Sequence, residues 1–442
     1  MKGIIITAPS SGSGKTMVTI GVIKALRDTG FNVCGFKTGP DYIDTSFISR
    51  ASGKEAGNLD MHLQGQVGMK QSLGLGEGEY CIIEGAMGYF DGIYNTYENS
   101  SFHIAKILSV NSILVYTPQN EMFSAVPKIK GMADFPGSTI KGVILNRVSE
   151  KMFHLLKDPI EKFTGLHVLG FVPSISDLEF KSRHLGLVQS VEISDINSRI
   201  QKIADIIKQN INLSLLIKLM ADVKALPVDY PSRRNIKVAV ARDKAFSFYY
   251  RENLNILSRC CDVVFFSPLT DTRLPQCDLL YLGGGYPEVF KDELALNTSM
   301  LASIKAFADR GGCIFAEGGG FMYLMDYIED CKMAGVFKGK ATMTDKLQQF
   351  GYIDIKLKKD CMLGKVGDKL TGHEFHKSVA MAQNADTVYS ITKTKGDKTW
   401  SCGYKYKNVL AGYPHISFFG NINSFLSMLD YVDKSKEGSL CI

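Results

Sequence analysis

The residues best suited to chemistry stand directly behind an apolar segment near the start of the chain. Residues 4–6 are isoleucines, residues 8–14 are small (Ala-Pro-Ser-Ser-Gly-Ser-Gly), and Lys15 and Thr16 then open a helical pattern. A strand, such a loop and a helix N-terminus present backbone N–H groups to a phosphate, with Lys15 placed for the β- and γ-phosphates and the Thr16 hydroxyl for Mg²⁺. Pro9 stands where the general pattern has glycine, but an ordinary turn would not explain Lys and Thr at the helix entry. We predict a nucleotide site, compatible with an ATPase, a GTPase or a kinase.

Charged side chains at the ends of two later apolar segments indicate how the nucleotide is used. Glu84 ends the segment 81–84, and Lys37 ends another, with Asp41 and Asp44 close behind it. The carboxyl ends of parallel strands meet at one edge of a sheet, and ligands bind there. An acidic residue at that edge can hold Mg²⁺ directly or through water. We therefore expect one cation and several carboxylates around a triphosphate.

The elements that must position these residues alternate along the chain as strands and helices, which predicts crossover units and a mainly parallel sheet. A polar segment with two prolines, residues 222–235, interrupts this rhythm, and a new strand begins at residue 236. We predict a first domain over 1–221, a linker over 222–235 and a second α/β domain over 236–442 that has no phosphate loop of its own. The expected strands are 3–7, 32–37, 80–84, 112–117, 141–146, 167–172, 236–241, 262–266, 279–282, 312–316, 351–357 and 408–412.

Composition narrows the classes of protein further. A chain of 442 residues is long enough for two or three domains, and 45% hydrophobic with 22% charged residues is typical of a globular protein. The net charge of +6 is small and is not gathered in one tract, so we expect no nucleic-acid partner. The ten cysteines show no CxxC spacing, which indicates reduced thiols rather than a zinc site or disulfides. No signal-peptide pattern and no run of 18 apolar residues occurs, so we expect a soluble, cytoplasmic protein with no membrane partner.

Several motifs together resemble the cobyrinic acid a,c-diamide synthases, two-domain amidoligases related to dethiobiotin synthetase. The resemblance covers both halves of the chain, in order. It implies two doubly wound α/β domains, an N-terminal P-loop NTPase domain and a C-terminal class I glutamine amidotransferase-like domain. The motifs are residues 8–16, 36–44, 84–92, 142–148 and 182–187 in the first half, and 240–246, 249–253, 266–269, 281–288 and 372–376 in the second.

The resemblance implies that ATP phosphorylates an acetate carboxylate of a corrin-type tetrapyrrole polycarboxylate, after which ammonia displaces phosphate and leaves an amide. ATP and Mg²⁺ are the implied cofactors. By this resemblance the phosphates contact Gly12, Ser13, Gly14, Lys15 and Thr16, and Mg²⁺ is bound by Thr16, Glu84 and one of Asp41 or Asp44. Lys37 screens the charge of the approaching carboxylate from the γ-phosphate, and Tyr42 and Ile43 lie near the substrate acid. Asn146 and Arg147 contact the base side and the phosphate side of the nucleotide.

In the second half the resemblance implies a glutaminase centre, which needs a Cys nucleophile on a sharp strand-to-helix turn, a His base and an oxyanion loop. Gly284 and Gly285 match the oxyanion loop and His415 matches the base, but Gly318 stands at the nucleophile position. Cys313 lies five residues upstream, about 16 Å away along a strand, and is expected to be a buried structural residue. Ser417 replaces a second histidine of the family.

We therefore expect that glutaminase activity is lost, and that nitrogen comes from ammonia, from a separate glutaminase, or from glutamine. The segment His373-Glu374-Phe375-His376 lacks the i, i+4 histidine spacing of a zinc protease, and we assign it no catalytic role. Two alternatives stay open at this point: the same reaction on nickel sirohydrochlorin, and a non-catalytic regulatory P-loop ATPase. A homodimer is compatible with either.

Overall fold

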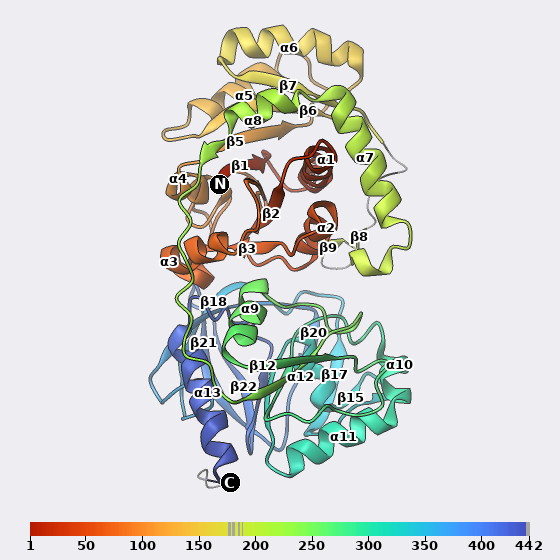
Figure 1. Ribbon diagram of the computed structural model, residues 1–442, viewed down its shortest axis with the longest axis vertical. Coiled ribbons are helices and arrows are strands. Elements are labelled where there is room, and N and C mark those ends of the chain that lie inside the picture. The colour runs from red at the N-terminus through yellow and green to blue at the C-terminus, as the bar shows by residue number, and fades with distance from the viewer. Residues whose placement is uncertain (176–177, 179–181, 184–185, 188, 439–442) are drawn as a thin grey trace. The chain divides into compact units, whose positions relative to one another are not determined.

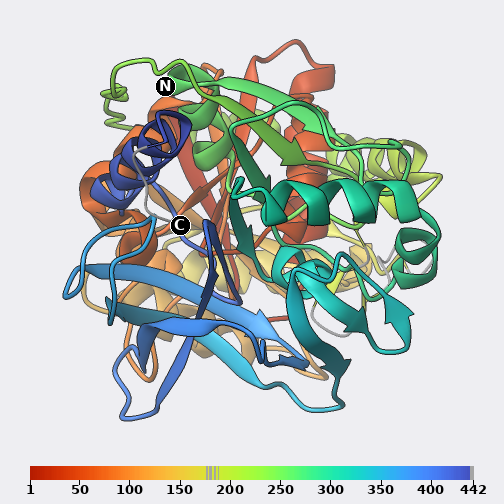
Figure 2. The ribbon, with the colours of Figure 1, turned by 90° about the horizontal axis from the view of Figure 1, so that it is seen from below.

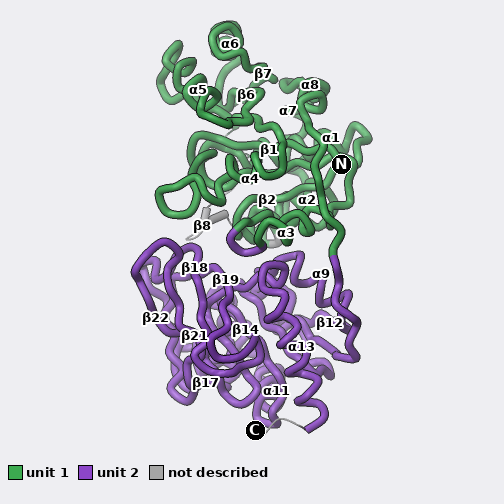
Figure 3. The backbone as a smooth tube through the Cα atoms, turned by 90° about the vertical axis from the view of Figure 1, so that its left-hand side faces the viewer, with its two compact units in different colours: residues 1–61, 65–228 green, residues 62–64, 229–442 purple. Residues whose placement is uncertain are grey.

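The computed structural model describes residues 1–175, 178, 182–183, 186–187 and 189–438 (Figure 1). The chain divides into two compact units, residues 1–61 with 65–228 and residues 62–64 with 229–442 (Figure 3). The division after residue 228 falls inside the segment 222–235. The first residue of that segment is structured, because Asp222 ends the short strand β10, which pairs with the first strand of the chain.

The first unit is built on a sheet with the strand order β3-β2-β4-β1-β5-β6-β7, in which every neighbouring pair is parallel. The strand β10 joins this sheet antiparallel to β1, and β8 and β9 form a separate pair. The strands are β1 (Lys2–Thr7), β2 (Val33–Thr38), β3 (Gly57–Leu59), β4 (Tyr80–Glu84), β5 (Asn111–Tyr116), β6 (Ile140–Asn146), β7 (His167–Val172), β8 (Ser182–Arg183), β9 (Gly186–Leu187) and β10 (Ala221–Asp222).

Helices cover both faces of this sheet because its central strands are apolar on both sides. Ile5 of β1 belongs to a buried cluster with residues of α3 and α4, whereas its neighbours in the strand point to the opposite face. There α1 packs against α7 so closely that a Cβ at Gly21 would lie 2.7 Å from Ile203. The helices are α1 (Lys15–Asp28), α2 (Ile43–Ser52), α3 (Met61–Gly74), α4 (Ser101–Leu108), α5 (Ala125–Asp134), α6 (Glu150–Thr164), η2 (Ser190–Glu192), α7 (Ile196–Asn210) and α8 (Leu213–Leu219).

The second unit contains a nine-stranded mixed sheet with the order β12-β11-β13-β14-β23-β22-β21-β18-β19. The first five strands in this order are parallel, and the remaining pairs are antiparallel. Figure 2 shows the light-blue strands of the antiparallel part side by side. The strands are β11 (Lys237–Ala241), β12 (Asp262–Phe266), β13 (Leu279–Leu282), β14 (Cys313–Glu317), β18 (Gln349–Leu357), β19 (Lys369–His376), β21 (Asp386–Lys393), β22 (Thr399–Tyr406) and β23 (Val409–Gly412).

A smaller sheet, β16-β15-β17-β20, accompanies it. The α/β class predicted for both halves is confirmed, but the antiparallel strands β19, β21 and β22 and the smaller sheet were not predicted. These strands contain many polar residues and do not form continuous apolar runs. The remaining elements are α9 (Arg251–Cys260), α10 (Lys291–Leu296), α11 (Thr298–Asp309), α12 (Gly319–Leu324), β15 (Met325–Ile328), β16 (Cys331–Lys332), β17 (Phe337–Met343), β20 (Ser378–Ala380) and α13 (Ile422–Lys436).

Candidate functional sites

The loop between β1 and α1 has the backbone of a phosphate-binding loop. Gly12 and Gly14 take positive φ angles of 76° and 84°, and α1 begins at Lys15, directly after Gly14. A Cβ at Gly14 would lie 2.3 Å from Nδ2 of Asn146, so only glycine fits there. Lys15 Nζ donates to the Ser10 carbonyl at 3.0 Å, which folds this cation back over its own loop.

Asn146 and Arg147, at the end of β6, hold this loop from the side. Asn146 Nδ2 donates to the Ser13 carbonyl at 2.9 Å, and Arg147 Nη1 lies 3.4 Å from the Gly12 carbonyl. Asn146 is fully buried, and its Oδ1 has no hydrogen-bond partner among the described residues. The two residues predicted as nucleotide contacts therefore shape the loop, and one of them keeps a buried acceptor oxygen.

A chain of polar contacts joins the phosphate loop to the neighbouring strand ends. Thr16 Oγ1 donates to Glu84 Oε1 at 2.6 Å, and Lys37 Nζ donates to the same oxygen at 2.8 Å. Lys37 also forms an ion pair with Asp44 Oδ2 at 2.6 Å. The sheet order explains this proximity, because β4 lies between β1 and β2 and pairs Lys37 directly with Glu84.

Asp41, one of the two residues implied as a further Mg²⁺ ligand, makes local backbone contacts. Its Oδ1 accepts from the backbone N–H groups of Ile43 (2.8 Å) and Asp44 (3.0 Å), so it caps the start of α2. The structure gives Asp41 no direct contact with Thr16 or Glu84. Tyr42 and Ile43 occupy the same helix start, where Ile43 is buried and Tyr42 is partly exposed.

Burial and mutual charge perturb the ionisation of this cluster. Burial, with a contribution from Lys37, lowers the pKa of Lys15 to about 8. Burial alone would also lower the pKa of Lys37, but Asp44 and Glu84 outweigh it, and the pKa of Lys37 is raised. Burial, reinforced by Asp44, raises the pKa of Asp41 to about 7. Burial likewise raises the pKa of Glu84, although Lys37 opposes it. Lys37 therefore stays protonated, and its positive charge offsets the repulsion among the carboxyl groups of Asp41, Asp44 and Glu84.

The residues present fit a Mg²⁺ ion that takes few protein ligands. Glu84 is fully buried, and its Oε2 has no hydrogen-bond partner within the described part of the chain. The described residues contain no group of three or more His, Cys, Asp or Glu side chains arranged to hold a metal. Mg²⁺ commonly keeps several waters and binds through one or two protein groups plus substrate phosphates. The Thr16 hydroxyl and the Glu84 carboxylate are the groups that would hold it.

The second unit carries a sharp turn where β14 meets α12. Gly318 has φ 51° and ψ −113° at this turn, a backbone conformation that L side chains rarely adopt. A Cβ at this residue would lie 2.7 Å from Nε2 of His415. The imidazole of His415 thus occupies the space in which a side chain at position 318 would begin.

Glu317, a buried residue that the sequence motifs did not reveal, lies beside His415. Glu317 Oε2 lies 3.7 Å from His415 Nδ1 and accepts from the Tyr281 hydroxyl at 2.8 Å. Glu317 Oε1 accepts from the backbone N–H of Ile416 at 2.8 Å. An acidic residue directly before the turn glycine was the available signal. Glu317 stands where a carboxylate can orient the imidazole, whereas the hydroxyl of Ser417 is buried without a partner among the described residues.

The predicted oxyanion loop lies against the same imidazole. A Cβ at Gly284 would lie 2.5 Å from His415 Cε1, so the loop and the base are in close contact. The N–H of Gly284 donates to the Phe248 carbonyl at 3.3 Å, which engages one of the N–H groups expected to face an oxyanion. Cys313 lies at the start of β14 and is buried, at the opposite end of that strand from the turn. Of the motif 182–187, residues 184 and 185 lie outside the described residues.

Comparison with known proteins agrees with both halves of this description. Residues 4–188 match the CobQ/CobB/MinD/ParA nucleotide binding domain, and residues 237–422 match the CobB/CobQ-like glutamine amidotransferase domain. The chain is 45% identical to a cobyrinate a,c-diamide synthase of Clostridium acetobutylicum over 96% of this chain and 98% of that protein. It is 42% identical to one of Clostridium tetani, over 97% of this chain and the whole of that protein.

The same kind of relative occurs outside the clostridia. A cobyrinate a,c-diamide synthase of Fusobacterium nucleatum is 38% identical over 95% of this chain and 98% of that protein. Among the described residues of this chain, no helix is both long enough and apolar enough to cross a membrane.

Proposed function

Because the chain belongs to the cobyrinate a,c-diamide synthase family, we propose that it amidates the a and c acetate carboxylates of cobyrinic acid with ATP and uses ammonia as the nitrogen source. The proposed intermediate is an acyl phosphate. A carboxylate repels nucleophiles and has no usable leaving group, and transfer of the γ-phosphoryl group to one of its oxygens removes both obstacles. Ammonia then attacks the carbonyl carbon, phosphate leaves, and the lost proton passes to solvent.

The phosphate loop and its neighbours support the first step. Backbone N–H groups of residues 12–16 and the Lys15 cation would bind the β- and γ-phosphates. Mg²⁺, held by Thr16 and Glu84, would neutralise charge on the phosphates. Lys37 lies between Asp44 and Glu84, and its fixed positive charge would offset the repulsion between an incoming carboxylate and the γ-phosphate. Tyr42 and Ile43, at the adjacent helix start, would contact the substrate acid.

The nitrogen source rests on one observation, the glycine at the turn between β14 and α12. Glutamine hydrolysis by a class I amidotransferase domain needs a thiolate at that turn, and Gly318 has no side chain. A Cβ at position 318 would also lie only 2.7 Å from His415 Nε2. We therefore propose that this unit does not hydrolyse glutamine, and that ammonia arrives free or from a separate glutaminase.

The test is a comparison of nitrogen donors with the purified full-length chain. Cobyrinic acid, ATP and Mg²⁺ are incubated with ammonium or with glutamine, and ADP release and the mass of the corrinoid are followed. We expect amide products with ammonium and none with glutamine. His415→Ala is the matched control, since it should leave the ammonium reaction unchanged, whereas Lys37→Met should abolish it. Turnover with glutamine at the ammonium rate would refute the loss of glutaminase activity.

A further inference from the structure

The strand β12 forms one end of the nine-stranded sheet and pairs with β11 alone. Its sequence, Asp-Val-Val-Phe-Phe, is rich in the β-branched and aromatic residues that favour strands. Val264 is 39% exposed and Phe265 is 44% exposed, although neighbouring residues of a strand point to opposite faces. Both faces of this apolar strand are therefore open to solvent, whereas β11 beside it is buried from Val238 to Ala241.

The outer edge of β12 presents backbone groups that the rest of the chain does not use. The Phe266 carbonyl accepts from the Arg242 N–H at 2.8 Å, so the backbone groups of Phe266 face the side of β11. Backbone groups of successive residues in a strand point to alternate sides, so those of Val263 and Phe265 point away from the sheet. Among the described residues, no backbone group forms a hydrogen bond with them.

The edges of the other large sheet and of the small sheet are short or covered. The end strands β3 and β20 have three residues each, and β16 has two. On β7, Gly170 pairs with Ile211, and the Asn212 N–H donates to the Leu169 carbonyl at 2.8 Å. An exposed edge is a template for pairing with another chain, and proteins commonly shorten, charge or cover such edges.

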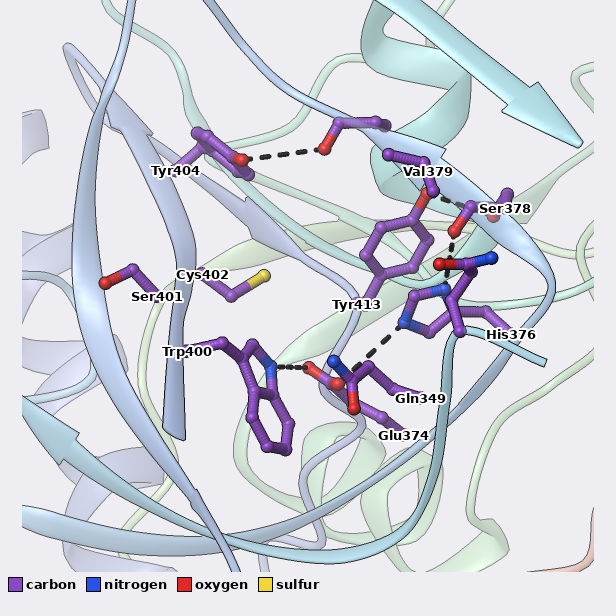
Figure 4. Close-up of a pocket in the computed structure, with 12 residues that line it drawn as sticks. Gln349, Glu374, His376, Ser378, Val379, Trp400, Ser401, Cys402, Tyr404 and Tyr413 are labelled. Carbon is purple, nitrogen blue, oxygen red and sulfur yellow. Dashed lines mark hydrogen bonds and ion pairs between the residues drawn. The ribbon is translucent and has the colours of Figure 1, made fainter. Parts of the chain in front are cut away.

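The opposite end of the nine-stranded sheet is covered as well. In β19, His373 exchanges two backbone hydrogen bonds with His415, at 3.0 and 2.9 Å. The last residue of β19 packs under a ring, because His376 stacks on Tyr413 with centroids 3.7 Å apart (Figure 4). Among the described strands, β12 is therefore the one long apolar end strand whose outer edge the chain leaves open.

We propose that β12 is the surface through which two copies of this chain associate, by antiparallel pairing of β12 with β12 of the second copy. A two-fold axis at Val264 is the register that pairs the whole strand. Val263 of one copy then lies opposite Phe265 of the other, and these two residues exchange their outward N–H and carbonyl groups, as in an antiparallel ladder. The axis repeats this exchange on its other side, and Val264 lies opposite itself.

The charges at the two ends of β12 favour this arrangement. Asp262, at the start of the strand, is ion-paired with Arg233. At the other end, the Arg242 guanidinium lies 5.1 Å from the centroid of the Phe265 ring, and the exposed Asp271 follows. Antiparallel pairing places the start of one strand beside the end of the other, so that Asp262 approaches Arg242, and Arg233 approaches Asp271, of the second copy.

A second copy is therefore the occupant that this surface fits. It offers the same apolar edge, the same outward backbone groups and the complementary charges, so the surface is self-complementary about a two-fold axis. Parallel pairing would instead place equal charges side by side, which disfavours association. This proposal does not depend on the proposed function.

The test is the mass of the purified full-length chain in solution, measured by sedimentation velocity over a series of concentrations. We expect a species of twice the chain mass. Val264→Lys places two lysines opposite each other at the two-fold axis and should raise the Kd of the dimer at least about tenfold. Leu296→Lys, at an 82% exposed leucine of α10 in the same unit, is the matched control and should leave the dimer intact.

A charge exchange tests the register. Val264→Glu should weaken the dimer as Val264→Lys does, whereas an equimolar mixture of the two variants should restore it, because residue 264 then meets the opposite charge. Circular dichroism shows whether the variants fold. Val263→Pro provides a further variant if the charged ones do not, since it removes an N–H that points away from β11 and leaves the pairing with β11 intact.

Four results would overturn the proposal. The unaltered chain could be monomeric, in which case β12 would be left for a different partner or for solvent. It could form an open series of larger species, whereas pairing about a two-fold axis closes at two copies. Val264→Lys could be as dimeric as Leu296→Lys, which would place the interface elsewhere. The mixture of Val264→Lys and Val264→Glu could remain monomeric, which would contradict the two-fold axis at Val264.

Discussion

Replacing Gly318 by alanine tests whether the nucleophile position has lost the room for a side chain. Two penalties add at this residue. An L residue at φ 51° and ψ −113° costs about 1–2 kcal/mol in backbone strain, and a Cβ 2.7 Å from His415 Nε2 adds about 1–2 kcal/mol of overpacking. We expect Gly318→Ala to lose about 3 kcal/mol of the free energy of unfolding of the second unit. For a unit of this size that is a decrease in Tm of about 6–12 °C.

A matched control separates the two penalties. Gly367, in the same unit, has φ 95° and open space where a Cβ would stand, so Gly367→Ala carries backbone strain alone. The steric part of the Gly318 penalty should disappear when His415 is also replaced by alanine, which gives a favourable coupling of about 1 kcal/mol in a double-mutant cycle. Trp400, the only tryptophan, lies in the second unit and reports its unfolding in urea or on heating.

The reasoning is refuted by either of two results. Gly318→Ala could prove no more destabilising than Gly367→Ala, or its penalty could add independently to that of His415→Ala. In both cases His415 would not be crowding a side chain at position 318. The proposed loss of glutaminase activity would then rest on the missing thiol alone.

Three further predictions concern the buried charges. Lys37→Met should cost about 3–5 kcal/mol at neutral pH, because it leaves buried carboxylates uncompensated. Without Lys37 the pKa of Asp41 would rise further in the folded state, so the folded variant would hold a proton that the unfolded chain releases. The free energy of unfolding of the variant should therefore fall as pH rises above about 4. A flat urea-unfolding profile between pH 5 and pH 8 would contradict this prediction. Since the pKa of Lys15 is about 8, about half of the Lys15 side chains are neutral at pH 8, and binding of a triphosphate should protonate them. Calorimetry in buffers of different ionisation enthalpy should detect an uptake of about half a proton. This uptake should be absent in Lys15→Met. Tyr281→Phe removes the hydroxyl that donates to Glu317 at 2.8 Å, and it should lower the free energy of unfolding of the second unit by about 1–3 kcal/mol. Ammonium-dependent amidation should be unchanged. Loss of that amidation would show that the contacts of Tyr281, Glu317 and His415 serve the reaction.

The parallel core of both units could be predicted from the sequence because its strands are continuous apolar runs. Segments such as 81–84 and 279–282 are buried along their whole length, so their pattern does not depend on which face they present. The strands β19, β21 and β22 escaped prediction for the opposite reason. Their outer faces are polar, and their short apolar stretches resemble those of loops.

The candidate site divides in the same way. Lys15, Thr16 and Gly318 could be found from sequence, because each stands at a fixed offset from its own strand and turn. Asp41 is predicted to lie near a metal ion, and the structure adds that its Oδ1 accepts two backbone N–H groups at the start of α2. Capping is a local backbone interaction that competes with ligand binding for the same oxygen, and residue type alone does not decide between them.

The sequence alone determined that this protein has a phosphate loop, acidic residues at strand ends and no thiol at the turn of its amidotransferase-like half, because each of these is a property of residue type and short-range spacing. Only the tertiary structure decided that Lys37 lies between Asp44 and Glu84 and that His415 lies against Gly318. Those contacts join residues up to about one hundred positions apart, and they depend on strand order and register, which no local pattern specifies.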